Sequence, residues 1–436
     1  MFWAICTALA LSCAAALAPP QHQRRLARGG AQPSSASQRS LALRQGSAAA
    51  HGPTPRGAFG ARAGGAGGCT ALRSTAEAEA VAAPKLQGNP KRGLLQATPI
   101  GVGSCTPDQL LTNDQLAEFI ETSDEWISQR TGISKRRLLP PNSSLQALAT
   151  TAAQRALTNS GIDASEIQLV IVATSSPDDL FGDASSVAAA IGASNAVAFD
   201  LTAACSGFLF GMVTAAQFME SGCYDTALVV GADALSRWVD WDDRNTAILF
   251  GDGAGAVVLR SSSGEGAGGK ALAPGLLGFE LRSNGLDNKY LQLPYCGVAR
   301  PLATAQGHDV TTGGYSAITM NGAEVYKFAT REVPKILEQA MANAEITVDQ
   351  VDWLLLHQAN IRIMETVAKR LGIPLEKIIT NLADHGNTSA GSIPLALDAA
   401  VRSGKVKNGD VVACAGFGAG LSWGAAIIRW GGDSTE

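Results

Sequence analysis

The body of the chain alternates short apolar runs with longer periodic segments. The continuous apolar runs are residues 169–175, 226–233, 255–260, 353–357, 411–417 and 424–430. Runs of this length are typical of strands buried on both faces. Between them lie segments with helical periodicity, such as residues 143–160 and 325–344. The alternation predicts an α/β protein with covered sheets, beginning near Arg92, where "RGLLQATPIGVGS" predicts the first strand.

The body also resembles itself at an offset of about 184 residues. "GIDASEIQLVIVATSSPD", from Gly161, aligns with "AEITVDQVDWLLLHQAN", from Ala344, and "FGDGAGAVVLR" later parallels "FGAGLSWGAAIIRW". This repeat predicts two similar α/β halves, residues 92–265 and 315–436, with an irregular insertion at 266–314. Ala173 and His357 then end equivalent strands, so the two strand ends can meet at a shared site.

Residues 1–91 lack this pattern. Residues 1–18, "MFWAICTALALSCAAALA", are apolar and uncharged and predict a signal-peptide-like segment. A membrane span is the alternative, because this length only just crosses a bilayer. Residues 19–91 are rich in Arg, Ser, Ala and Gly and predict a transit-peptide-like leader, with a plain disordered basic tail as the alternative. Together they resemble the two-step leader of algal plastid proteins. We therefore expect a stromal protein with no stable membrane span after processing.

Charge and cysteine content exclude several classes of function. Residues 1–76 carry eight arginines and no acid, so the formal net charge of -4 leaves about -12 on the rest. An acidic body makes nucleic acid an improbable partner. Of the eight cysteines, five lie in the body and none forms a CxxC pair. Neither a zinc cage nor a disulfide framework is expected.

Cys205 lies in "FDLTAACSGFLFG", between a predicted strand and a predicted helix. A thiol at a helix N-terminus feels the positive end of the helix dipole, which favours the nucleophilic thiolate. Its small neighbours leave space for an acyl group. A small core thiol is the alternative, since free cysteines are usually buried.

Three further segments carry candidate chemistry. His357 ends the apolar run "WLLLH", where catalytic groups often emerge from a sheet, although a core histidine is nearly as plausible. Asn387 lies in "HGNTSAGSIP" and can donate through its amide, while Thr388, Ser389 or Ser392 can cap a helix there. "GFGAGLSWG", residues 416–424, offers backbone N–H groups for an oxyanion hole or, less specifically, for a phosphate.

Together these segments resemble the β-ketoacyl-acyl-carrier-protein synthase III family. The motifs are "DLTAACSGF", "LLLHQANIRI", "HGNTSAGSIPLALDAAV" and "GFGAGLSWG", and "TSDEWISQRTGISKRR", "TSSPDDLF" and "ILFGDGAGAVVL" also match in the family's order. The resemblance covers about residues 94–430. It implies a thiolase-like fold of the α/β class, a five-layered αβαβα duplication of two similar halves.

The resemblance also implies a mechanism and its residues. Cys205 takes an acetyl group from acetyl-CoA, and the N–H groups of Cys205 and Gly420 form the oxyanion hole. His357 and Asn387 stabilise the enolate formed when malonyl-acyl carrier protein loses CO2, giving acetoacetyl-carrier protein. The reaction initiates type II fatty acid synthesis. It uses acetyl-CoA as a substrate and needs no metal, nicotinamide or flavin cofactor.

The implied binding residues are carried over one by one. Trp126 and Arg244 match an adenine sandwich, and Arg130 and Thr131 match other CoA contacts. One departure is Ala323 in "NGAEVYK", where the family commonly has Asn, which puts a pantetheine contact in doubt. Phe181 matches the residue that gates the acyl pocket of a neighbouring subunit, which implies a homodimer.

A basic surface is expected for an acidic carrier protein. Arg362, Lys369 and Arg370 share one face of the helix predicted after His357, and Lys327 is a further candidate. The alternative is an ordinary solvated helix face.

Related enzymes offer rival interpretations. Elongating synthases use Cys-His-His and thiolases Cys-His-Cys, and neither triad fits "GNTSAGS". His385 and Cys414 are the residues that keep these alternatives open, but His385 is interpreted as a structural neighbour and Cys414 lies inside a predicted strand. Type III polyketide synthases share Cys-His-Asn and use malonyl-CoA, so they are the main enzymatic alternative. A non-catalytic acyl-binding homologue is the alternative from another class, and retention of all three polar residues speaks against it.

Overall fold

The computed structural model describes residues 97–261 and 275–431. The predicted signal-like segment (1–18) and transit-like leader (19–91) lie outside these ranges. Within them, no helix combines the length and apolar character needed to cross a bilayer.

The first sheet has five strands in the order β1-β7-β6-β4-β5. Their bounds are β1 Ala97–Cys105, β7 Gly253–Ser261, β6 Thr226–Asp233, β4 Leu169–Ala173 and β5 Val197–Leu201. β4 is parallel to both β5 and β6, whereas β7 is antiparallel to β6 and to β1. The predicted strand runs in this half of the chain are therefore correct, and β5 lies at the edge of the sheet.

The second sheet has four strands in the order β13-β14-β15-β8. Their bounds are β13 Trp353–Leu356, β14 Val411–Gly418, β15 Ser422–Arg429 and β8 Leu276–Ser283. One parallel pair is followed by two antiparallel pairs, the same sequence of directions as β4-β6-β7-β1 in the first sheet. The faint sequence repeat therefore reflects a structural duplication, with β4 equivalent to β13.

One predicted boundary differs from the structure. Residues 266–314 were expected to form an irregular insertion, yet β8 lies within this interval and pairs with β15 along its length. The glycine-rich stretch before Leu276 hides the strand in the sequence, and the strand's own residues at its start are buried. The sheet of the second half therefore draws one strand from within the expected insertion.

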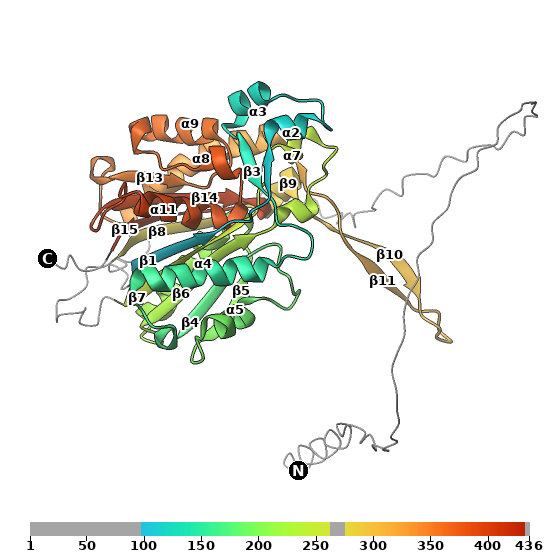
Figure 1. Cartoon of the computed structure of the whole chain (residues 1–436), viewed down its shortest axis with the longest axis horizontal. Helices are drawn as coiled ribbons and strands as arrows, with labels where there is room; N and C mark the ends of the chain where they lie inside the picture. The colour runs from blue at the N-terminus through green and yellow to red at the C-terminus, as the bar shows by residue number, and fades with distance from the viewer. Residues whose placement is uncertain (1–96, 262–274, 432–436) are drawn as a thin grey trace, which may run out of the picture. The chain divides into compact units, whose positions relative to one another are not determined.

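Helices cover and separate the two sheets (Figure 1). On the outer face of the first sheet lie α4 Leu145–Ser160 and α5 Ala184–Ile191, and on the outer face of the second lie α8 Gly322–Asn343 and α9 Ile361–Leu371. Between the sheets lie α6 Gly207–Glu220 and α11 Ser392–Arg402, whose buried residues contact strands of both. This is the expected αβαβα arrangement.

The central helix α6 is apolar around most of its surface, as expected of a helix covered on both sides. Two glycines let it approach the first sheet closely. A Cβ atom at Gly211 would lie 3.1 Å from Val229 Cγ1, and one at Gly207 would lie 3.2 Å from Ala173 Cβ. The start of α6 is thereby held against the carboxyl end of β4.

The remaining elements are short and lie around the two halves. The helices are α2 Asn113–Ala117, α3 Asp124–Thr131, α7 Arg244–Ala247 and α10 Leu382–His385. The strands are β2 Leu110–Thr112, β3 Lys135–Arg137, β9 Leu291–Gln292, β12 Thr319–Met320 and the exposed hairpin β10 Tyr295–Pro301 and β11 Asp309–Tyr315. Three short 3-10 helices, η2 Ala204–Ser206, η7 Ser389–Gly391 and η8 Ala419–Leu421, lie near the site described below. The other 3-10 helices of the described residues are η1 Ala164–Glu166, η3 Leu235–Trp238, η4 Gly285–Tyr290, η5 Val348–Gln350 and η6 Leu375–Lys377.

Candidate active site

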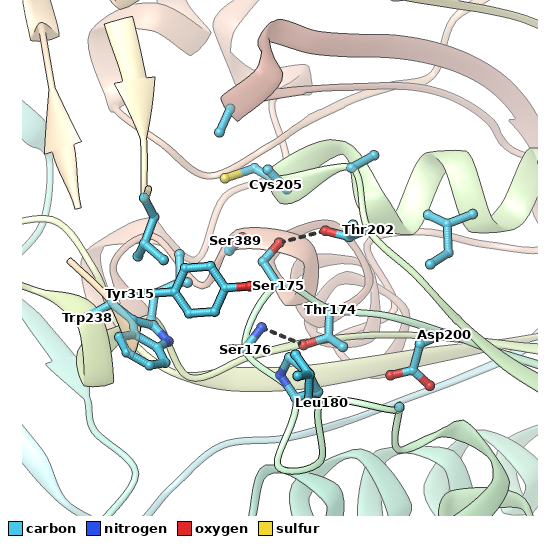
Figure 2. Close-up of a pocket in the computed structure, with 18 of the residues that line it drawn as sticks. Thr174, Ser175, Ser176, Leu180, Asp200, Thr202, Cys205, Trp238, Tyr315 and Ser389 are labelled. Atoms are coloured by element: carbon cyan, nitrogen blue, oxygen red, sulfur yellow. Dashed lines mark hydrogen bonds between the residues drawn. The ribbon is translucent and has the colours of Figure 1, made fainter. Parts of the chain in front are cut away.

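Cys205 lies in η2, immediately before α6 and after β5. The preceding Ala204 has a φ of 48°, a left-handed conformation that costs a non-glycine residue free energy. The turn places the thiol on the wall of a cavity of about 1100 Å³. Figure 2 shows Cys205, Ser389, Trp238 and Tyr315 around this cavity. The small residues around Cys205 thus leave room for an acyl group, as predicted.

The charge state of Cys205 differs from the expectation. The helix N-terminus was expected to favour the thiolate, but the residue is only 6% exposed, and burial raises the pKa of the thiol to about 12. Desolvation of a negative sulfur outweighs the helix dipole here. The resting residue is therefore a protonated thiol, which must lose its proton as it attacks.

The glycine loop between β14 and β15 packs against the Cys205 backbone. A Cβ atom at Gly418 would lie 2.6 Å from Cys205 N, so only glycine fits there. Gly420 lines the same cavity and has a φ of 117°, which glycine adopts readily. The structure thus brings both predicted oxyanion-hole residues to one cavity.

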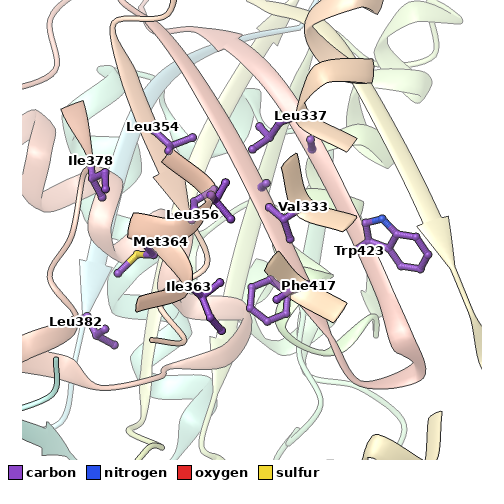
Figure 3. Close-up of a cluster of buried hydrophobic side chains, with 14 of the residues drawn as sticks. Val333, Leu337, Leu354, Leu356, Ile363, Met364, Ile378, Leu382, Phe417 and Trp423 are labelled. Atoms are coloured by element: carbon purple, nitrogen blue, oxygen red, sulfur yellow. The ribbon is translucent and has the colours of Figure 1, made fainter. Parts of the chain in front are cut away.

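His357 follows β13 directly and is 2% exposed. Its backbone N–H donates to the Ala415 carbonyl at 2.8 Å, and its ring packs edge-on against Phe417 with centroids 5.4 Å apart. Figure 3 shows Phe417 and Leu356 in the core behind this strand end. Burial lowers the pKa of His357 to about 3, so the imidazole is neutral at physiological pH.

Asn387 lies in the loop before η7 and is 6% exposed. Its Oδ1 accepts the Ser389 N–H at 2.9 Å, which fixes the amide orientation and leaves Nδ2 as the outward donor. Its backbone pairs with residues on either side of Phe250. Among the described residues, none accepts a hydrogen bond from Nδ2.

These segments converge around Cys205. η7 contacts η2, Ser389 lines the cavity with Cys205, and Gly418, next to Phe417, touches the Cys205 backbone. His357 and Asn387 do not themselves line the cavity, although Phe250 does. The cavity therefore exposes the nucleophile, while the two donor residues are held in the adjoining segments.

Trp126 on α3 is flanked by two guanidinium groups. The Cζ atoms of Arg130 and Arg244 lie 4.5 and 4.7 Å from its ring centroid. An inserted base needs about 3.5 Å on each face, so Trp126 and Arg244 must separate before adenine can lie between them. The structure thus brings Trp126 and Arg244 into direct contact, with no space for a base between them.

Thr131 does not fit its predicted role as a CoA contact through its side chain. The residue is buried, and its hydroxyl donates its only proton to the Ile127 carbonyl at 2.7 Å and accepts the Ile133 N–H at 3.0 Å. Its side chain faces the protein interior and stabilises the end of α3. The sequence could not show which face of the short helix is buried.

The four predicted docking cations lie on α8 and α9, but their charges are not equally available. Lys327 pairs with Glu324 at 2.7 Å and Lys369 with Glu365 at 3.6 Å. Arg362 and Arg370 instead donate to the backbone carbonyls of Gln129 and Thr330. The uncompensated positive charge therefore comes from the two arginines.

Phe181 and Leu180 project from the loop between β4 and α5. Their exposed fractions are 99% and 80%, and both border the cavity. Such exposure is unusual for large apolar side chains.

Rival site residues lie elsewhere. Cys414 is buried within β14, as predicted, and His385 ends α10 with its Nδ1 buried and unpartnered. Within the described ranges, no group of three or more His, Cys, Asp or Glu side chains is arranged to hold a metal ion.

Two buried residues were not anticipated as parts of the site. Ser392, considered only as a helix cap, has its Oγ 2.7 Å from His357 Nδ1. Asp233, at the end of β6, is fully buried, and burial raises the pKa of its carboxyl. It accepts hydrogen bonds from the Ser175 N–H and the Ala390 N–H and so joins the two halves beneath η7. Both contacts span long sequence separations, and no local motif announces them.

Comparison with known proteins identifies the family. Residues 199–285 match the family model described as 3-oxoacyl-[acyl-carrier-protein (ACP)] synthase III, and residues 341–430 match the model for its C-terminal part. A curated β-ketoacyl-[acyl-carrier-protein] synthase III from Nostoc sp. is 57% identical over 331 residues, covering 76% of this chain and 97% of the relative.

Solved structures agree. The synthase III (FabH) of Thermus thermophilus matches with a TM-score of 0.68 and 38% identity, covering 77% of this chain and all of that one. The priming β-ketosynthase of the R1128 polyketide pathway matches with a TM-score of 0.68 and 32% identity, covering 79% and 99%. Because it is 57% identical to the curated Nostoc synthase III over 97% of that protein, the chain belongs to the β-ketoacyl-[acyl-carrier-protein] synthase III family.

Proposed function

We propose that this protein is a β-ketoacyl-acyl-carrier-protein synthase III that initiates type II fatty acid synthesis. The observation that carries the proposal is the convergence of the segments that hold a buried thiol, a neutral imidazole and an oriented amide: Cys205 lines the cavity, and His357 and Asn387 lie in the segments that adjoin it. The identity of 57% with a curated synthase III over almost all of that protein supports it.

In the first half-reaction, Cys205 attacks the thioester carbonyl of acetyl-CoA. A bond forms between Sγ and the carbonyl carbon, the thiol proton leaves, and CoA departs as the thiol. The N–H groups of Cys205 and Gly420 receive the oxyanion, and one such donor is typically worth about 3 kcal/mol. Because the thiol is protonated at rest, its deprotonation is coupled to substrate binding rather than completed beforehand.

In the second half-reaction, malonyl-acyl carrier protein loses CO2 and leaves an enolate on its thioester. His357 Nε2 and Asn387 Nδ2 donate hydrogen bonds to the enolate oxygen. The enolate carbon then attacks the acetyl-Cys205 carbonyl, the S–C bond breaks, and acetoacetyl-carrier protein is released. A neutral histidine suits this role, because it donates a hydrogen bond without transferring its proton.

Mass measurement of the intact protein tests the nucleophile. Incubation with acetyl-CoA is expected to add one acetyl group, and Cys205→Ala is expected to abolish the addition. Acetylation that survives the substitution would sink the assignment. Malonyl-carrier protein and malonyl-CoA offered separately then test the type III polyketide alternative, which requires preference for malonyl-CoA.

The CoA site is proposed at Trp126 and Arg244, with Arg130 at its edge. The support is the stacking of both guanidinium groups on one indole ring. Ala323 lies in the first turn of α8 and offers no hydrogen-bonding side chain where the family commonly has Asn.

Carrier-protein docking is proposed on α9, with Arg362 and Arg370 as its main charges. Their guanidinium groups bond to carbonyls and keep their positive charge, whereas Lys327 and Lys369 are paired with glutamates. Charge reversal at Arg362 is expected to raise KM for the carrier substrate and not for acetyl-CoA. An equal effect on both substrates would argue against docking.

A homodimer is proposed, built on the edge strand β5 and the Phe181 loop. β5 hydrogen-bonds only β4 among the described strands, and its Val197 is half exposed. A second copy covering this edge would bring the apolar loop of each chain beside the cavity of the other.

Plastid import through residues 1–91 is also proposed. The relative from Nostoc is covered over 97% of its length by 331 residues of this chain, so about a hundred residues here have no counterpart in it. Fusion of residues 1–91 to a fluorescent protein tests this, and a diffuse cytosolic signal would reject it.

A further inference from the structure

One nitrogen of the His357 ring contacts a hydroxyl group at the start of α11. Ser392, the first residue of α11, places Oγ 2.7 Å from His357 Nδ1. Both side chains are buried, so water does not compete for the contact. The Gln358 N–H also points at Ser392 Oγ, at 3.4 Å.

The positions of the protons follow from the available partners. A serine hydroxyl has one proton to donate and two lone pairs to accept with. Ser392 Oγ already accepts from Gln358, and within residues 97–261 and 275–431 His357 Nδ1 is the one acceptor available for its proton. If Nδ1 carried a proton instead, Ser392 Oγ would accept from both Nδ1–H and the Gln358 N–H, and its own buried proton would be left without an acceptor, which is unfavourable. The hydroxyl therefore donates to Nδ1.

This hydrogen bond decides which nitrogen of the imidazole is protonated. The ring is neutral and carries one proton, so a proton-free Nδ1 leaves that proton on Nε2. We propose that Ser392 is a positioning residue that holds His357 in the Nε2–H tautomer, the form that can donate to the enolate. The proposal rests on the proposed function and specifies how its second half-reaction is prepared.

The side chain of Gln358, the next residue in the chain, helps to fix the contact between Ser392 and His357. Its Nε2 donates to the Leu356 carbonyl at 2.6 Å and its Oε1 accepts the Asn381 N–H at 3.2 Å. The fully buried amide thereby fixes the backbone that follows β13. The Gln358 N–H is held in place as a donor, which keeps the Ser392 proton directed at the imidazole.

Ser392→Ala separates the two half-reactions. Release of CO2 from malonyl-carrier protein by the acetylated enzyme is expected to fall by about 10- to 100-fold in kcat, because a misplaced tautomer removes a transition-state donor. KM for the carrier substrate and the rate of Cys205 acetylation are expected to stay within about twofold. Ser392→Thr, which retains the hydroxyl, is expected to recover most of the lost rate.

Ser403→Ala is the matched control, because Ser403 lies just beyond the other end of α11 and donates only to the Ala400 carbonyl. It is expected to leave both half-reactions unchanged. If Ser392→Ala decarboxylates at the rate of the unmodified protein, Ser392 has no positioning role. If the unmodified protein neither acetylates nor decarboxylates, the proposed function itself fails.

A spectroscopic measurement tests the tautomer without relying on any variant. In the full chain labelled with 15N-histidine, the ring correlations of His357, assigned by comparison with His357→Gln, are expected to show a protonated Nε2 and a bare Nδ1. In Ser392→Ala they are expected to shift toward a mixture of tautomers. A protonated Nδ1 in the unmodified protein would overturn the proposal whatever the variants do.

Discussion

At the scale of single residues, the site is built from groups that burial keeps uncharged. Burial raises the pKa of Cys205 to about 12 and lowers the pKa of His357 to about 3. A thiolate–imidazolium pair at rest would require both pKa values to move the other way. The histidine therefore acts as a hydrogen-bond donor, and the thiol becomes reactive only when a thioester and its oxyanion donors share the developing charge.

This charge state predicts the pH dependence of Cys205 alkylation. The thiolate fraction rises about tenfold per pH unit below the pKa, so the rate with iodoacetamide is expected to keep rising up to pH 10 without a plateau. Peptide mass spectrometry separates Cys205 from the exposed Cys223, which serves as an internal comparison. A plateau for Cys205 near pH 7 would show that an ion pair activates it in the resting protein.

At the scale of elements, two short helices from distant parts of the chain hold the two residues of the proposed adenine site. Trp126 comes from α3 and Arg244 from α7, and Arg244 also donates to the Glu121 carbonyl at 2.9 Å. The sandwich is closed, with 4.7 Å between the guanidinium carbon and the ring centroid. The proposed binding of adenine between these two residues therefore requires one side chain to move.

Trp126→Ala is expected to raise KM for acetyl-CoA by about tenfold, since loss of a stacking partner costs about 1 to 2 kcal/mol. The acetyl thioester of N-acetylcysteamine has no adenine and is the matched control substrate. Its use should be unaffected by the substitution. Equal losses with both substrates would mean that Trp126 stabilises α3 rather than binding the nucleotide.

At the scale of the whole molecule, the duplicated sheets place equivalent strand ends beside one another. One part of the surface exposes large apolar side chains to solvent. Phe181 and Leu180 form the most exposed part of that surface, next to the edge strand β5. Because large apolar side chains rarely face water in this way, a second copy of the chain is the expected cover.

Sedimentation measures this association directly. The unmodified protein is expected to be a dimer at micromolar concentration, and Phe181→Asp is expected to weaken the dimer at least tenfold, because a carboxylate would be buried unpaired. Phe119→Asp, at another exposed phenylalanine (55% exposed), is the control. A monomeric unmodified protein would refute the dimer.

Most of the architecture could be predicted from the sequence, because buried strands and a duplication leave local patterns. The apolar runs became β4, β6, β7, β13, β14 and β15, and the 184-residue offset became the equivalence of β4 with β13. The strand β8 was missed, because pairing with β15 is a tertiary contact and the preceding glycine-rich stretch suggested a loop.

The sequence could predict which residues form the candidate site, but it could not predict their charge states or their hydrogen bonds. Cys205 and His357 lie at element boundaries, which a sequence shows. The pKa of Cys205, the inward hydroxyl of Thr131 and the contact of Ser392 with His357 depend on burial and on contacts between distant residues. No periodicity or motif carries that information.

The buried, protonated state of Cys205 has a consequence for the durability of the protein. Peroxide and disulfides react with thiolates, and with a pKa of about 12 only about one Cys205 in 100,000 is a thiolate at pH 7. A nucleophile of this kind is expected to resist oxidative inactivation between turnovers.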